Sequence, residues 1–149
     1  MKLKIFLAYA IDEDEFRGSK VREKLSKIIS DCGHEVIGAG IGSNPVIPTD
    51  SSKELCKVIA RHDLIEQQGA HITITVTDGK TFCVGTPIEF FKGYELGQYS
   101  ILYITNPEYK VNSIFFKAFA DKIVYSEKEL KKILIDWGDT YDTHKRNLH

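Results

Sequence analysis

Apolar residues fall into short continuous runs along the chain, and between these runs they recur at the spacing of a helix. Five runs predict β-strands, at residues 2–10, 35–39, 71–76, 99–105 and 122–125. The first run lacks a clean alternation of apolar and polar positions, as is typical of a strand buried on both faces. In the third run, Ile72, Ile74 and Val76 alternate with threonines.

Helices are predicted in the intervals between the strands. Apolar residues recur at helical spacing from Val21 to Cys32, and Gly33 ends this helix. Further helices are predicted at about 51–67, 86–97 and 114–119, and from Ser126 onward. The expected inward-facing residues are Leu55, Val58, Ile59 and Ile65 in the second helix, and Leu130, Ile133, Leu134 and Trp137 in the last.

This order of elements predicts an α/β fold. Strands that alternate with helices form a doubly wound, mostly parallel sheet with right-handed crossovers. We therefore expect a single domain at 1–137, with a five-stranded sheet and helices on both faces, followed by a polar C-terminal tail at 138–149. A chain of 149 residues is long enough for one core.

Composition argues against several classes of protein. The net charge of −1 indicates neither a nucleic-acid surface nor a polybasic membrane patch. No apolar run reaches about 18 residues, so no membrane span is expected. The cysteines Cys32, Cys56 and Cys83 form no CxxC pair, and we expect no zinc site, disulfide or cofactor, and a cytoplasmic location. His62 and His71 are not at metal-ligand spacing with acids on one face, so we interpret both as structural.

The stretch 84–97 is the most informative part of the sequence. A polar turn links the strand at 71–76 to a helix in which Thr86 is the expected N-cap and Pro87 the first residue. Glu89 is then expected in the first turn, where the helix dipole favours a carboxylate. Thr86 and Glu89 also fit a capping box. The residues alone therefore leave two interpretations of Glu89 open, capping and catalysis.

Two other segments fit the same capping pattern. They are Ser51-x-x-Glu54 and Ser126-x-x-Glu129. We interpret both as helix caps only.

Three motifs together resemble the nucleoside 2-deoxyribosyltransferase family. They are Pro48-Thr49-Asp50, Asp63-Leu64-Ile65, and Gly85-Thr86-Pro87-Ile88-Glu89, with Gly97 eight residues after the glutamate. The resemblance implies that Glu89, rather than Glu95, is the nucleophile at an N-glycosidic bond. It also favours Asp63, with Asp78 as the alternative, as the acid that protonates the leaving base. The implied substrate is a small nucleoside or nucleotide.

The resemblance also implies a set of substrate-binding residues. They are Ala8, Tyr9, Asp50, Asp78, Cys83, Gly85 and Asp121. In this family a neighbouring subunit lends an asparagine to the site, which implies a homo-oligomer, and Asp121 or Asn112 is the candidate for that place. Plainer roles remain open for several of these residues: a solvated helix position for Asp63, an N-cap for Asp50, a buried strand end for Tyr9 and an apolar filler for Cys83.

The sequence also departs from the family. Ala8-Tyr9-Ala10 stands where the first loop usually carries glycine, and Cys83 stands where transferases often have an aspartate. The acidic segment 11–15 would repel a phosphate, unlike the loop of the related deoxynucleoside-monophosphate hydrolases. Two alternatives therefore stay open: a hydrolase of a nucleoside 5′-monophosphate or a TIR-like hydrolase of NAD, and a non-catalytic nucleotide-binding or interaction module.

Overall fold

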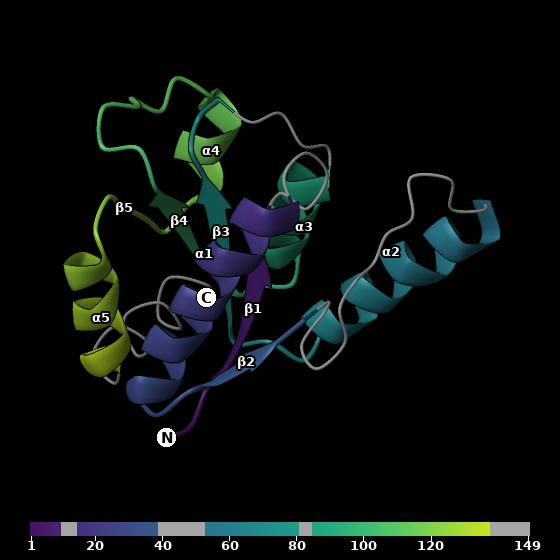
Figure 1. Cartoon of the computed structure of the whole chain (residues 1–149), viewed down its shortest axis with the longest axis horizontal. Coiled ribbons are helices and arrows are strands. Elements are labelled where there is room, and N and C mark those ends of the chain that lie inside the picture. The colour runs from purple at the N-terminus through teal and green to yellow at the C-terminus, as the bar shows by residue number, and fades with distance from the viewer. Residues whose placement is uncertain (10–14, 39–52, 81–84, 138–149) are drawn as a thin grey trace.

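The computed structural model describes residues 1–9, 15–38, 53–80 and 85–137. The elements alternate along the chain as predicted (Figure 1). They are β1 (Lys4–Ala8), α1 (Glu15–Asp31), β2 (Glu35–Ile37), α2 (Lys53–Gln67), β3 (Ile72–Thr77), α3 (Gly85–Glu95), β4 (Tyr99–Ile104), α4 (Ile114–Phe119), β5 (Lys122–Val124) and α5 (Glu127–Ile135). The tail predicted at 138–149 lies outside the described residues.

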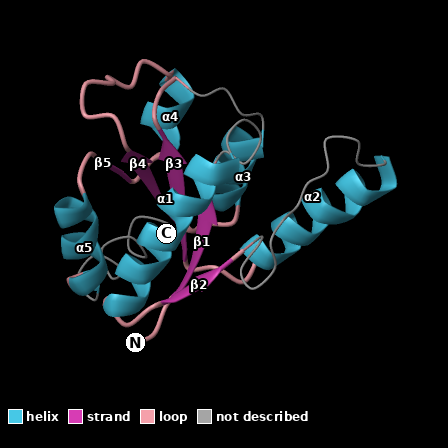
Figure 2. Cartoon of the chain, in the orientation of Figure 1, coloured by secondary structure: helices cyan, strands magenta, loops and turns pink. Residues whose placement is uncertain are grey.

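The five strands form one parallel sheet in the order β2-β1-β3-β4-β5. All four neighbouring pairs are parallel. β3 is central, and its register places Ile74 beside Leu7 of β1 and beside Ile101 of β4. The predicted fold class is confirmed: a parallel five-stranded α/β sheet with helices packed on it (Figure 2).

Two groups of helices cover the two faces of the sheet. On one face, Leu25 and Ile29 of α1 and Leu130 and Leu134 of α5 pack in a single cluster with the strands, and the ring of Trp137 closes it. On the other face Leu102 and Ile104 of β4 pack with Phe116 of α4. The inward-facing residues predicted for the last helix are therefore confirmed.

The threonines of β3 are as buried as its apolar residues. Thr73 and Thr75 are 0% exposed, as are Ile72 and Ile74. Because helices cover both faces of a parallel sheet, an alternating pattern does not give this central strand a solvent-facing side. The Thr73 hydroxyl therefore needs a hydrogen-bond partner inside the protein, and this partner is the side chain of Gln98.

α2 departs from the prediction. Val58 and Ile65 are each 64% exposed, so the expectation that both face inward is wrong. The side chains of Leu55 and Ile59 lie outside the described part of the helix. Figure 1 shows α2 extending away from the sheet, with its C-terminal end nearest to the strands. The buried residues of α2 are instead polar: Asp63 and Gln67.

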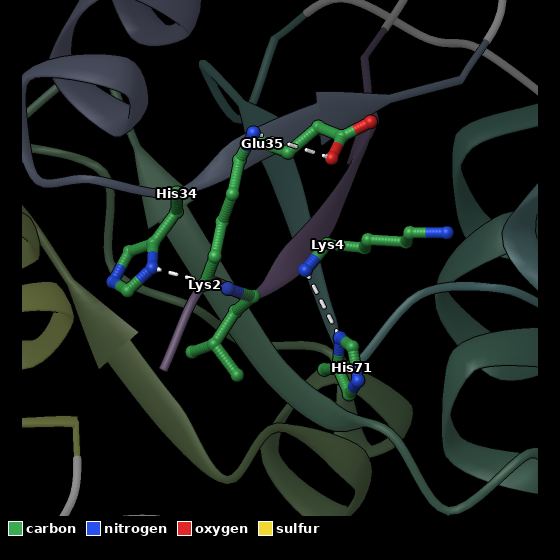
Figure 3. Close-up of polar contacts among 6 residues, drawn as sticks. Lys2, Lys4, His34, Glu35 and His71 are labelled. Carbon is green, nitrogen blue, oxygen red and sulfur yellow. Dashed lines mark hydrogen bonds and ion pairs between the residues drawn. The ribbon is translucent and has the colours of Figure 1, made fainter.

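Hydrogen bonds to two histidines join the starts of neighbouring strands in the sheet. The Lys4 N–H donates to Nδ1 of His71 at 2.9 Å, and the Leu3 N–H donates to Nδ1 of His34 at 3.4 Å (Figure 3). Nε2 of His34 lies 2.8 Å from the carbonyl oxygen of Leu134, which ties α5 to the same end of the sheet. The structural role predicted for His71 is confirmed.

One of the two plain helix caps is also confirmed. The Ser126 hydroxyl accepts a hydrogen bond from the Glu129 N–H at 3.2 Å, and the Glu129 carboxylate accepts one from the Tyr125 N–H at 2.9 Å. These bonds fix the start of α5. Ser51 of the other box lies outside the described residues.

None of the helices in the described parts of the chain combines the length and the apolar character that crossing a membrane requires.

Candidate active site

The C-terminal ends of β1 and β3 are neighbours in the sheet, because Ala8 pairs with Thr75. From β1 the chain continues to β2 on one side, whereas from β3 it continues to β4 on the other. Doubly wound sheets bind ligands at this position, where the strand order reverses. Tyr9 directly follows β1 and Asp78 directly follows β3, so two predicted binding residues flank it.

These residues also have structural contacts. Ala8 is fully buried. The Tyr9 hydroxyl accepts a hydrogen bond from Nη1 of Arg22 at 3.4 Å. Oδ1 of Asp78 accepts one from the Lys80 N–H at 2.8 Å, which stabilises the turn after β3. Their contacts with a substrate stay predictions.

Glu89 lies in the second turn of α3 and is half-buried. We expected it in the first turn, after an N-cap at Thr86. The helix instead begins at Gly85, one residue before Thr86, and its first turn contains no acidic residue. That expectation is wrong. The capping box of Thr86 and Glu89 stays a prediction, as does the catalytic role of Glu89.

Gly85 begins α3 without close packing against the described residues. A Cβ added there would meet no described atom within 4 Å. Its φ is not positive. Neither the described packing nor the backbone geometry therefore demands glycine there. Asp50 and Cys83, two further predicted binding residues, lie outside the described residues.

Asp121 lies at the opposite edge of the sheet, just before β5. Its Oδ2 accepts a hydrogen bond from the Ser100 N–H at 2.8 Å, and its own N–H donates to the Ser100 carbonyl at 2.9 Å. The residue therefore joins the starts of β4 and β5. Its contribution to the site of a neighbouring copy, which the resemblance implies, stays a prediction.

Asp63 is buried in α2, with 8% of its surface exposed. The alternative of a solvated helix position is therefore wrong. Burial raises the pKa of its carboxyl from 3.8 to about 6, and the nearby charge of Glu66 adds to the shift, while His62 opposes it. A carboxyl with a pKa of about 6 can hold a proton near neutral pH and release it to a leaving group.

The raised pKa of Asp63 predicts a dependence of stability on pH. The folded pKa of about 6 exceeds the ordinary value of 3.8, so between these pH values the folded state binds more protons than the unfolded state. The free energy of unfolding should therefore fall as pH rises through this window, by about 2 kcal/mol from Asp63. Asp63→Asn should lack this loss. Urea unfolding at pH 4 and pH 7 measures it, with Glu54→Gln on the exposed side of α2 as the control.

His62, Asp63 and Glu66 form a small group of possible metal ligands. One donor atom from each lies within 4.8 Å of the others. The expectation that His62 lacks acidic neighbours at ligand spacing is therefore wrong. His62 is largely exposed and lies 3.7 Å from the Glu66 carboxylate. The carboxyl of Asp63, whose pKa is about 6, would have to lose its proton before it could bind a cation there.

Sequence reasoning missed a set of buried polar residues beneath α3. Gln67, Thr73 and Gln98 are 0%, 0% and 5% exposed. Nε2 of Gln67 donates to the backbone carbonyl of Glu89 at 2.6 Å. The available signal was the spacing of Gln67, four residues after Asp63, which places both side chains on one face of α2.

Comparisons with known proteins place this arrangement in context. No protein-family model matches the chain, and no curated protein sequence matches it significantly. Solved structures do match. A 2-deoxyribosyltransferase from Bacillus psychrosaccharolyticus is similar with a TM-score of 0.69 and 21% identity, over 86% of this chain and 90% of that one. The CMP N-glycosidase BcmB of Clostridium botulinum gives 0.55 and 19%, over 88% and 97%.

The same fold also serves a different class of protein. A CheY-like response regulator receiver domain from Methanospirillum hungatei has a TM-score of 0.58 and 15% identity, over 99% of both chains. These likenesses show a shared doubly wound fold. They agree with the resemblance predicted from the motifs, while the choice of chemistry depends on the residues of the site.

Proposed function

We propose that the protein cleaves the N-glycosidic bond of a nucleoside or nucleotide, with Glu89 as the nucleophile. The observation that carries the proposal is the contact between α2 and α3. Gln67, one turn after Asp63, binds the backbone carbonyl of Glu89. The nucleophile and a carboxyl with a pKa of about 6 are thus presented by adjoining helices. The motif resemblance and the two similar N-glycosidic enzymes support the same chemistry.

Each carboxyl has a distinct role in this reaction. The Glu89 carboxylate attacks the anomeric carbon, a C–O bond forms, and the bond from that carbon to the base nitrogen breaks. Asp63 gives its proton to the departing base. An incoming base or a water molecule then attacks the same carbon, gives its proton to the Asp63 carboxylate and releases the Glu89 carboxylate. The choice between these acceptors decides whether the enzyme is a transferase or a hydrolase.

The resemblance further supports a homo-oligomer. Asn112 and Asp121 are both exposed, so a neighbouring copy could contact either residue. The Asp121 carboxylate also accepts a hydrogen bond from the Ser100 N–H within its own chain.

Product analysis tests the proposal. The protein is incubated with deoxyadenosine, deoxycytidine or their 5′-monophosphates, with and without a free acceptor base, and the products are separated by chromatography. We expect release of the base from at least one substrate, and a new nucleoside only with acceptor present if the enzyme is a transferase. If the protein cleaves none of these nucleosides and nucleotides but releases nicotinamide from NAD, the substrate is NAD. Tight binding without turnover of any of these compounds would contradict an enzymatic role.

A further inference from the structure

A closed ring of buried hydrogen bonds lies directly beneath Glu89. Nε2 of Gln67 donates to Oγ1 of Thr73 at 3.1 Å as well as to the Glu89 carbonyl at 2.6 Å. The Thr73 hydroxyl donates to Oε1 of Gln98 at 2.6 Å, and the Gln98 amide donates back to the carbonyl of Gln67. The ring joins the end of α2, the middle of the sheet and the residue before β4. Among the described contacts, the bond from the ring to α3 goes to the backbone carbonyl of Glu89.

The packing around this ring leaves little room for movement. A Cβ added at Gly93 of α3 would lie 2.8 Å from Oγ1 of Thr73 and 3.3 Å from Nε2 of Gln67. α3 thus approaches β3 closely one turn after Glu89. Both N–H groups of the Gln67 amide are engaged, so its plane and its reach toward Glu89 are fixed.

The ring is not the simplest way to fill this part of the core. Oε1 of Gln67 is buried and has no hydrogen-bond partner among the described residues, which opposes folding. An apolar side chain of similar size would fill the space without this penalty. A glutamine is therefore better explained by the bond that it makes to Glu89 than by packing.

We propose that Gln67 is a positioning residue that holds the Glu89 peptide so that the carboxylate meets the anomeric carbon. This inference rests on the proposed function. The Gln67 amide donates to the Thr73 hydroxyl and to the Glu89 carbonyl, so we do not expect it to touch the substrate. Because rates of attack depend steeply on the placement of the reacting atoms, a loosened Glu89 peptide lowers kcat more than it weakens binding.

Two variants separate positioning from general support. Gln67→Met keeps the volume but removes the bond to Glu89. Thr73→Val removes the bonds of the Thr73 hydroxyl to Gln67 and Gln98 but keeps both partners of the bond from Gln67 to Glu89. We expect kcat to fall about 10- to 100-fold in Gln67→Met, with KM changed less than about 3-fold, and a clearly smaller fall of kcat in Thr73→Val. Equal losses in the two variants, or an unchanged kcat in Gln67→Met, would overturn the positioning role.

A second readout does not depend on turnover. Amide hydrogen exchange of the peptide covering α3 should accelerate in Gln67→Met relative to Thr73→Val. Unchanged exchange in Gln67→Met would show that the bond from Gln67 does not hold the Glu89 peptide, whatever the activity. If the parent protein has no turnover but exchange accelerates in Gln67→Met, the proposed function is overturned, while the structural effect of Gln67 on the Glu89 peptide is supported. The two failures are therefore distinguishable.

Discussion

Replacing Glu89 by glutamine should lower kcat/KM for N-glycosidic bond cleavage by about 1,000-fold or more, because the amide cannot attack the anomeric carbon. The substitution preserves the size of the side chain. It also preserves the backbone carbonyl to which Gln67 binds, so the packing of α3 should be unaffected. The measurement is the initial rate of base release with a substrate identified by chromatography.

Glu95→Gln is the matched control for this variant. Glu95 lies on the same helix, is exposed, and pairs with Lys92 at 3.2 Å. Its substitution should leave the rate within about 2-fold, because an exposed ion pair contributes little to stability. Mass spectrometry of the quenched parent reaction should detect a glycosyl adduct on the peptide that contains Glu89. Full activity in Glu89→Gln would show that Glu89 is not the nucleophile, and helix capping would remain as its role.

Gly79→Ala should destabilise the fold by about 2–4 kcal/mol. Gly79 lies in the turn after β3 with a φ of 75°, and an added Cβ would overlap the ring of Tyr109. The substitution therefore combines an unfavourable backbone conformation with a steric clash. The free energy of unfolding in urea measures the loss.

Gly33→Ala separates these two effects. Gly33 has a φ of 86°, but a Cβ there would meet no atom within 4 Å. Its substitution should cost about 1 kcal/mol from the backbone alone. If both alanine variants lose the same stability, the contact between Gly79 and Tyr109 is unimportant, and the ring simply moves aside.

The strands and the last helix could be predicted because their signals are local. The third strand was expected at 71–76 and is found at Ile72–Thr77, and α5 begins after Ser126 as its capping pattern indicates. The parallel order followed from the alternation of strands and helices, since crossovers of this kind have one preferred hand.

The faces of α2 could not be predicted in the same way. Apolar spacing identifies a stripe on a helix, but it does not say whether another element covers that stripe. Val58 and Ile65 lie on the exposed side, while Asp63 and Gln67 lie on the buried side. The burial of Asp63, and hence its raised pKa, depends on this tertiary arrangement.

The candidate site shows the same division. Glu89 and Asp63 were proposed as site residues from motif spacing. The ring of Gln67, Thr73 and Gln98, in contrast, joins residues up to 31 positions apart. No local period marks such contacts. The start of α3 at Gly85 lies one residue before the start that the Thr86 and Pro87 pattern favoured, a difference by which helix ends commonly vary.

The chain contains a single tryptophan, and its position makes it an intrinsic fluorophore for one half of the molecule. Trp137 is 3% exposed and packs edge-on against Tyr99, with ring centroids 5.1 Å apart. It belongs to the cluster of α1 and α5, whereas α3 and Glu89 lie on the other face of the sheet. Its emission should therefore shift to longer wavelength when the α1–α5 face opens, and remain nearly constant when a substrate binds beside Glu89. Optical spectroscopy can thus follow unfolding separately from ligand occupancy, without any added label.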